Sequence, residues 1–472
     1  MHINLSRRHA ISLIGCSAVA ASSAVTAKCP TDPLSICNVT NLNTVNAGSI
    51  VKVQQTEEIQ YALNTWRGNL SIGGGRYSMG GQTGIENGLQ LDMRSMNKLL
   101  SFDPNNRIAR VEAGMRWRDL QKIIDPQDLA IQTMQSYANF TIGGSLSVNC
   151  HGRYVGHGPV SESIRSFKLV LPQGDALEVS RQSNAELFHA AIGGYGGVGV
   201  IAEIELNLDE NFKLEKSVTH VSLEDYPAWF RENILANPRV LLHNADLQPS
   251  KFNKPRCITW SRSEKPLTIH DRLRPEHIHY KKEKLALWAL SELPGSSVLR
   301  EKIVNPIQEK PEVVWRNYEA SLDVAELEPA TRNISTYVLQ EYFIPERNFA
   351  KFADAISKLM QSIPTGTINV SIRHSPADQT TLMSWAQQDV FSFVVYYKQR
   401  VSTEAVRAVG DWTRAMIGLA QSLEGSYYLP YQLHATRQQF LRSYPSATNF
   451  NKLRQQLGAS RLTNTMWEQY KI

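Results

Sequence analysis

The stretch that decides the fold is Ser71-Ile72-Gly73-Gly74-Gly75-Arg76-Tyr77-Ser78-Met79-Gly80-Gly81-Gln82. A second glycine run follows at 141–152 and a third at 193–201. Glycine allows a backbone to turn with positive φ or to touch a ligand directly. Successive backbone N–H groups in such turns form concave anion sites. We therefore predict that the first two runs are strand-to-loop corners and that all three face one ligand, a dinucleotide.

The common nucleotide motifs do not fit these runs. The Gly-x4-Gly-Lys-Ser/Thr pattern of a phosphate-binding loop is absent. A Rossmann fingerprint needs Gly-x-Gly-x-x-Gly between a strand and a helix. The segment 77–84 after the first glycines is a poor helix start, so this fold is also disfavoured.

The order of the three runs resembles the FAD domain of the vanillyl-alcohol oxidase / p-cresol methylhydroxylase flavoproteins. Val111–Leu120 is similar to the strand and helix that follow that family's first loop, and Gly197–Ile204 to the strand that closes its flavin site. Within this family, the sequence pattern most resembles the aldonolactone and decaprenylphosphoryl-ribose oxidoreductase branch. The resemblance implies an α+β fold: a two-subdomain FAD-binding domain of the p-cresol methylhydroxylase (PCMH) type with an inserted cap that carries an antiparallel sheet and flanking helices.

The chain divides into five predicted segments. Residues 1–27 are predicted to be a twin-arginine signal peptide, because Arg7 and Arg8 precede an apolar stretch that ends in a small-x-small cleavage pattern. The rival interpretation is a lipoprotein signal with Cys16 as the lipidated residue. Either interpretation predicts an exported, periplasmic protein, free or tethered to a membrane. The other predicted segments are a lead-in (28–45), the FAD-binding domain (46–210), the cap (211–426) and a return to the flavin site (427–472).

Composition limits the possible partners. The 472 residues are 42% hydrophobic and 20% charged, as in a soluble globular protein of two or more domains. The net charge of +6 is spread without a basic block, which argues against nucleic-acid binding. His277 and His279 have no third ligand nearby, so no metal site is expected. In an oxidising compartment Cys29 and Cys37 can form a disulfide.

The resemblance implies a set of FAD contacts in the three runs and near the C-terminus. In many members a histidine in the first loop attaches FAD covalently, and Arg76 stands at that position here. Arginine cannot form this bond, so we predict dissociable FAD. The expected cofactor-binding residues are Gly73, Gly74, Gly75, Arg76, Tyr77, Ser78, Gly80, Gly81, Gln82, Thr141, Gly143, Gly144, Ser147, Asn149, Cys150, Gly152, Gly199, Ile201 and Asn464.

The expected catalytic residues come from the second run, the cap and the return segment. His151 belongs to a His-Gly pair that lies beside the flavin in the related branch. Alternation places Ser371 with Arg373, and Tyr396 with Lys398, on one face of paired cap strands. The segment 427–434 resembles the family's last active-site strand, with Tyr431 where the ribose oxidase branch has lysine. The set is His151, Arg373, Lys398, Tyr431 and His434, with His151 or His434 as the base.

These residues predict an FAD-dependent oxidoreductase that oxidises a C–OH group of a sugar, alditol or aldonolactone. The expected chemistry is hydride transfer to flavin N5, with electrons passed to oxygen or a quinone-like acceptor. Cys150 falls where aldonolactone enzymes have a small residue that gates oxygen, so its bulk is expected to hinder oxygen. Two alternatives stay open: an FAD enzyme for a non-sugar alcohol, hydroxy acid or amine, and an inactive flavin- or ligand-binding protein. The amphipathic segment 281–304 is expected to pack on the neighbouring domain, with a membrane-surface contact as the alternative.

Overall fold

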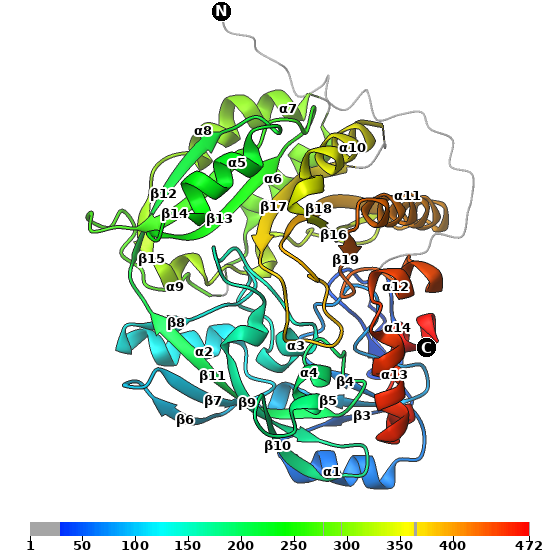
Figure 1. Cartoon of the computed structure of the whole chain (residues 1–472). Helices are drawn as coiled ribbons and strands as arrows, with labels where there is room; N and C mark the ends of the chain where they lie inside the picture. The colour runs from blue at the N-terminus through cyan, green and yellow to red at the C-terminus, as the bar shows by residue number, and fades with distance from the viewer. Residues whose placement is uncertain (1–28, 277, 294, 363–365, 472) are drawn as a thin grey trace, which may run out of the picture.

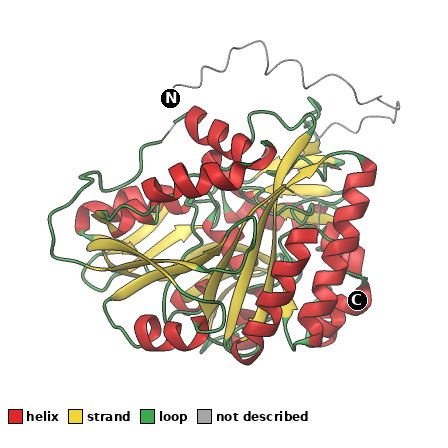
Figure 2. Cartoon of the chain, turned by 90° about the horizontal axis from the view of Figure 1, so that it is seen from above, coloured by secondary structure: helices red, strands yellow, loops and turns green. Residues whose placement is uncertain are grey.

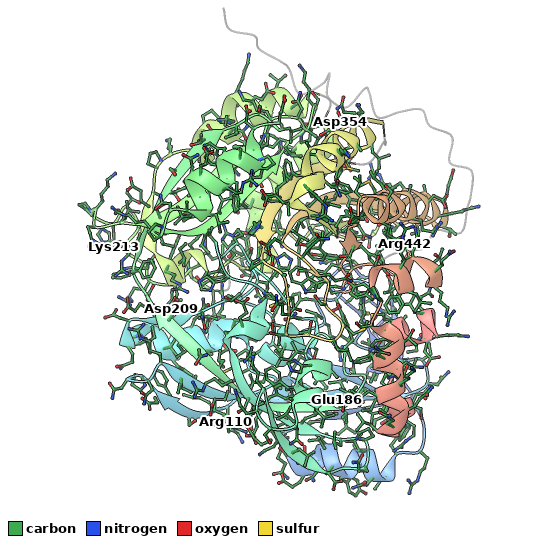
Figure 3. All side chains as sticks on the ribbon, in the orientation of Figure 1. Arg110, Glu186, Asp209, Lys213, Asp354 and Arg442 are labelled. Carbon is green, nitrogen blue, oxygen red and sulfur yellow. A yellow bond between two sulfur atoms is a disulfide. The ribbon has the colours of Figure 1, made fainter. Side chains whose placement is uncertain are left out.

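The computed structural model of the chain describes residues 29–276, 278–293, 295–362 and 366–471. The predicted signal peptide, Cys16 and His277 lie outside these residues. Two stacked halves make up the molecule: a base, built mainly from residues 29–210 and the C-terminal helices, and a cap above it (Figure 1). The chain passes from base to cap between Asp209, near the end of β11, and Lys213, which begins β12 and is labelled above Asp209 in Figure 3.

The smaller part of the base is a three-stranded parallel sheet with the strand order β3-β5-β4. The first glycine run begins where its strand β4 ends, as predicted. The disulfide between Cys29 and Cys37 is present in the lead-in, next to a short hairpin. The elements are β1 (Ser35–Ile36), β2 (Val45–Asn46), β3 (Ser49–Lys52), α1 (Thr56–Thr65), β4 (Leu70–Gly73) and β5 (Leu89–Asp92).

The larger part of the base is an antiparallel sheet with the order β10-β9-β11-β7-β6, to which β8 adds by pairing with β11. The third glycine run leads directly into β11, the central strand. The elements are β6 (Leu99–Asp103), β7 (Ile108–Glu112), α2 (Trp117–Ile124), β8 (Leu129–Ile131), α3 (Ile142–Ser147), β9 (Ile164–Val170), β10 (Ala176–Ser180), α4 (Ala185–Ala191) and β11 (Val200–Glu210).

The second glycine run is not the strand-to-loop corner that we predicted. It forms the short helix α3, and Thr141 caps its start by accepting a hydrogen bond from the Gly144 N–H at 3.3 Å. The reason is local, because a hydroxyl at the N-cap satisfies an N–H group that has no partner inside the helix. The glycines then let α3 approach the base strands closely.

The cap is built on one eight-stranded antiparallel sheet, in the order β15-β12-β14-β13-β17-β18-β16-β19. The antiparallel sheet and flanking helices that the resemblance implied are present, and β16, α10, β17, β18, α11 and β19 follow one another along the chain. The elements are β12 (Lys213–His220), α5 (Tyr226–Phe230), β13 (Val240–Leu247), β14 (Arg256–Arg262), α6 (Lys281–Glu292), α7 (Ser296–Leu299), α8 (Asn305–Gln308), β15 (Val313–Trp315), α9 (Arg316–Glu319), β16 (Ser335–Pro345), α10 (Phe349–Ser362), β17 (Gly366–Ser375), β18 (Val390–Arg400), α11 (Thr403–Ser422) and β19 (Ser426–Tyr427).

One face of the cap sheet packs against helix α10, and the other faces the cavity. On strand β18, Phe391 and Phe393 point to the face that α10 covers, where they meet the rings of Phe349 and Phe352. The alternate residues, Val394 among them, point to the opposite face. That second face looks onto the site described below, so the strand alternation separates core from site.

The segment 281–304 is helical up to Glu292 and again from Ser296, as predicted. None of the α6 residues is fully buried, and Leu285 and Trp288 are 64% and 47% exposed. In the part of the chain that the structure describes, no helix has the length and apolar character needed to cross a membrane. Contact of this segment with a membrane surface stays a prediction.

The C-terminal segment crosses back to the base. Only Ser426 and Tyr427 are a strand, so most of the predicted active-site strand 427–434 is a loop instead. Pro430 lies within it and cannot donate a ladder hydrogen bond.

Figure 2 shows the strands crossing between helices that lie around them. The last helices are α12 (Arg437–Ser443), α13 (Ala447–Gln456) and α14 (Thr465–Tyr470).

Candidate active site and flavin cradle

The first two glycine runs touch one another. A Cβ built on Gly74 would lie only 2.3 Å from Thr141 Oγ1, so a side chain at this position would collide with the cap of α3. The first run is also fastened to the C-terminal loop: Gln82 Nε2 donates to the carbonyls of Leu429 and Tyr431 at 2.7 and 2.8 Å. These contacts bring three distant segments to one place.

Two adjoining cavities lie between the glycine runs and the cap. The smaller one, of about 70 Å³, extends among all three runs, and the larger one, of about 620 Å³, continues under the cap sheet. Both are lined by Gly74, Ser78, Thr83, Thr141, Gly144 and Val148. No acidic side chain among the described residues lines the smaller cavity, whereas hydroxyl, amide and glycine backbone groups do. This donor set suits a phosphate-bearing cofactor, and the larger cavity has room for a ring system and a substrate.

Most of the predicted cofactor residues line these cavities. The ones that do so are Gly74, Gly75, Arg76, Tyr77, Ser78, Gln82, Thr141, Gly143, Gly144, Ser147, Cys150, Gly199 and Ile201. The structure does not bring Gly73, Gly80, Gly81, Asn149, Gly152 or Asn464 to either cavity wall.

Asn149 and Asn464 have structural partners instead. Asn149 is fully buried and its amide donates to Asp378 Oδ2 at 2.8 Å, which ties the second run to the cap. Asn464 caps α14, and its amide donates to the Tyr195 carbonyl in the third run at 3.0 Å. Both residues therefore hold the glycine runs in place without facing the cavities.

Arg76 occupies the left-handed region, with φ 61°. Its Nη2 donates to Gln90 Oε1 at 2.8 Å and lies 3.7 Å from Asp92, while its Nε has no partner. Burial and the nearby Arg94 lower the pKa of Arg76, and Asp92 opposes them. The side chain is thus anchored by the base and lines the larger cavity as a cation.

His151 forms the centre of a buried polar group on the wall of the larger cavity. Its Nε2 lies 2.7 Å from Glu341 Oε1, and both side chains are at least 95% buried. The Tyr431 hydroxyl donates to Glu341 Oε2 at 3.1 Å. Arg373 lines the same cavity, and its Nε has no hydrogen-bond partner. We call these four residues the His151 group.

The charges in the His151 group determine the protonation of its members. Burial raises the pKa of Glu341, but His151, Arg373 and the hydrogen bond from Tyr431 outweigh it and hold this pKa below its usual value. Burial and the Glu341 charge raise the pKa of Tyr431 well above its usual value. Glu341 is therefore an anion and Tyr431 a neutral donor at neutral pH.

Two predicted catalytic residues, Lys398 and His434, do not line the cavity and have other partners. Lys398 shares a face with Tyr396 but pairs with Glu292 of α6 at 2.6 Å. His434 contacts Gln432 Oε1 at 2.7 Å, and burial and Arg414 lower its pKa to about 4. A histidine with that pKa is a weak base, which leaves His151 as the candidate base.

Glu341 was missed by the sequence analysis, although the signal was present. It is a charged residue within the strand pattern Tyr337–Ile344, where every neighbour is apolar or neutral. Such a residue is buried only when it is paired. The partner, His151, is 190 positions away in another half of the molecule, so the pair itself was invisible in the sequence.

Cys150 lies beside the His151 group. Its thiol donates to Gln135 Oε1 at 3.1 Å, and burial raises its pKa to about 12. It is therefore a neutral, unreactive group that occupies space at the cavity wall. Among the described residues, no cluster of three or more His, Cys, Asp or Glu side chains is arranged to hold a metal.

Comparisons with known proteins agree with this geometry. Residues 47–180 match the family described as FAD binding domain. The chain is 31% identical over 157 residues to the mitochondrial L-galactono-1,4-lactone dehydrogenase of Brassica oleracea, a match that covers 33% of this chain and 26% of that protein. It is 21% identical over 382 residues to the L-gulonolactone oxidase of Mus musculus, covering 78% and 82%. The fold matches cholesterol oxidase from Brevibacterium sterolicum with a TM-score of 0.68 at 12% identity, covering 94% and 99%.

The chain therefore shares the fold of the matched cholesterol oxidase and carries an FAD-binding domain at residues 47–180, the part of the chain that contains the first two glycine runs. FAD is its cofactor, and the two cavities are where the residues fit it. The match to the Brassica oleracea dehydrogenase spans only about a quarter of that protein's length.

Proposed function

We propose that the protein is an FAD-dependent oxidoreductase that oxidises a C–OH group of a small molecule. The observation that carries the proposal is the buried His151–Glu341 contact of 2.7 Å on the wall of the cavity that adjoins the glycine runs. Such an arrangement is typical of a general base that is oriented by a carboxylate. The similarity to L-galactono-1,4-lactone dehydrogenase and L-gulonolactone oxidase supports a polyhydroxyl or lactone substrate, and the acceptor that we propose is oxygen or a quinone.

The side chains divide the work as follows. His151 accepts the proton of the substrate hydroxyl, and Glu341 stabilises the imidazolium that forms. Tyr431 holds Glu341 through its second oxygen, and Arg373 faces the cavity to bind the substrate oxygen. The chemistry that bound FAD supplies is acceptance of a hydride, with its electron pair, from the substrate carbon. The products are a carbonyl compound and a protonated His151.

Flavin bleaching under anaerobic conditions tests the proposal. The FAD-loaded protein is mixed with L-galactono-1,4-lactone, L-gulono-1,4-lactone, alditols and simple hydroxy acids. We expect at least one donor to bleach the flavin, and His151→Ala to slow the bleaching by about 100-fold or more, since a general base contributes at least that factor. His270→Ala, at an exposed position, is the matched control. No bleaching by any donor favours the flavin-binding alternative, and a full rate in His151→Ala rejects the base.

We propose further that the protein is exported. The twin-arginine pattern at residues 6–27 and the Cys29–Cys37 disulfide support an oxidising compartment. The test is fractionation of cells that produce the full chain, with Arg7→Lys/Arg8→Lys as the variant. Export of the wild-type protein and retention of the variant are expected, and cytoplasmic wild-type protein contradicts the proposal.

A further inference from the structure

Arg300 is a buried cation without a partner. It lies in the turn Arg300–Val304 that follows α7, is 6% exposed and lines the larger cavity. None of the described residues gives it a hydrogen bond or an ion pair, and its Nη2 is buried and unsatisfied. Burial and the neighbouring Arg256 lower the pKa of Arg300 to about 10, although Asp246 opposes them, so Arg300 remains charged at neutral pH. A buried charge is normally paired, so this one indicates a missing anion.

The other cations near Arg300 on the cavity wall are paired, unlike Arg300 itself. Arg256 and Lys216, the latter four residues further along the sheet register, also line the cavity. Arg256 lies 3.3 Å from Asp246, and Lys216 lies 3.1 Å from Glu312. Glu309 is 3.9 Å from Arg256 but does not line the cavity. Arg256 and Lys216 therefore have carboxylate partners, whereas Arg300 has none among the described residues.

The sheet register fixes how far Arg256, next to Arg300 in the cavity wall, lies from the His151 group. Glu341 pairs across the strands with Val394, which pairs with Ser371. Ser371 pairs with Asp246, and Asp246 with Arg256. Paired residues point to the same face, and all five line the cavity. The row spans four strand spacings, which is about 19 Å between Glu341 and Arg256.

Between the two ends the sheet row itself carries Val394, Ser371 and Asp246, and the apolar surface comes mainly from side chains around this row. From the sheet it receives Val394 and Ile258, and from the helices above it Leu287, Leu290 and Val304. The cavity therefore has a polar end at His151, an apolar middle and a cationic end at Arg300. A small lactone is too short to contact both ends.

We infer that Arg300, supported by Arg256 and Lys216, binds an oxyanion, a carboxylate or a phosphate, at the far end of an elongated alcohol substrate. The inference rests on the proposed oxidation of a C–OH group, but it assigns that hydroxyl to a longer substrate than the lactones named for the matched relatives. The planar guanidinium offers a fork of N–H donors that matches either oxyanion in a bidentate manner. The apolar middle selects the chain between the anion and the hydroxyl.

Calorimetric binding to the FAD-loaded protein tests this without any turnover. The probes are dodecanoate, dodecyl phosphate and methyl dodecanoate, the last being the neutral counterpart. We expect at least one anion to bind about 10- to 100-fold more tightly than the ester, the range that a charge-assisted hydrogen bond supplies. The tighter anion identifies carboxylate or phosphate. In Arg300→Gln this preference disappears, whereas the exposed Lys302→Gln control keeps it.

Stability of the ligand-free protein gives a second, independent readout. If Arg300 is kept for a ligand, Arg300→Gln unfolds at the same temperature as the wild type or a higher one, because an uncompensated buried charge is removed. Arg300→Lys retains the charge and is expected to keep part of the anion preference. The inference is wrong if the wild type binds the ester as tightly as both anions, if it binds none of the three, or if Arg300→Gln leaves the preference intact. It is also wrong if Arg300→Gln and Arg300→Lys both unfold at clearly lower temperatures, which would make the residue structural. Failure of flavin bleaching with intact anion binding would instead count only against the proposed reaction.

Discussion

Replacement of Glu341 by glutamine tests the His151 group with the smallest change of shape. The amide fills the same space but carries no charge. In the wild type the carboxylate makes two close polar contacts, at 2.7 Å to His151 and 3.1 Å to Tyr431. Glu341→Gln therefore changes the electrostatics of the group and leaves the packing of β16 intact.

The expected loss follows from these two contacts. A hydrogen bond to a charged group, such as the one from Tyr431, is worth about 1.5–3 kcal/mol and one to a neutral group about 0.5–1.5 kcal/mol. With the same difference assigned to the close ion contact with His151, each contact weakens by about 1–1.5 kcal/mol. Both contacts matter most when His151 carries the substrate proton. The sum of about 2–3 kcal/mol corresponds to a rate of flavin reduction lower by about 30- to 150-fold. Substrate binding should change less, because the charge on His151 develops during the reaction.

Stopped-flow measurement of flavin reduction under anaerobic conditions gives this rate directly. Glu424→Gln is the matched control, since Glu424 lies at the surface, 63% exposed, in a pair with Arg347. Exposed pairs contribute little, so this control should reduce its flavin at the wild-type rate. If folded, FAD-loaded Glu341→Gln also reaches the wild-type rate, Glu341 does not support the base and the account of the His151 group is refuted.

Three further predictions concern pH, oxygen and the cysteines. Burial, with Glu319 and Asp323, raises the pKa of Glu326 to about 7 from the usual 4.5, so the folded protein holds a proton that the unfolded chain loses. The free energy of unfolding should therefore fall as pH rises from about 4.5 to about 7. Thermal melts at pH 5 and pH 8 measure this fall, and Glu326→Gln should reduce it by at most about 3 kcal/mol. An unchanged pH profile in Glu326→Gln would contradict the assignment. Cys150→Gly should make reoxidation of the reduced flavin by oxygen several-fold faster, because it opens the cavity wall, and an unaltered rate would reject a steric role. Iodoacetamide without reductant should leave Cys29 and Cys37 unlabelled, and labelling of either in the folded protein would exclude the disulfide.

The flavin cradle was largely predictable from the sequence, whereas the catalytic group was not. Gly74 lies so close to Thr141 that no side chain fits there, and a glycine run in the sequence indicates such a close approach directly. Tyr396 and Lys398 share a face as the alternation predicted. Lys398, however, forms an ion pair with Glu292, which lies about a hundred residues away in the sequence. His434 has a suitable side chain for a base, but its burial beside Arg414 makes it a weak one. Burial and partners from distant parts of the chain decide whether a side chain can be catalytic, and the local strand pattern reveals neither of them.

The central claim is that the glycine runs hold dissociable FAD, with Arg76 at the position where related proteins attach it. The most direct test is the absorption spectrum of the purified protein before and after acid precipitation. We predict oxidised-flavin bands before precipitation and release of all the yellow colour to the supernatant. Colour retained in the pellet would contradict the non-covalent site, and a colourless protein that takes up no added FAD would contradict the account as a whole.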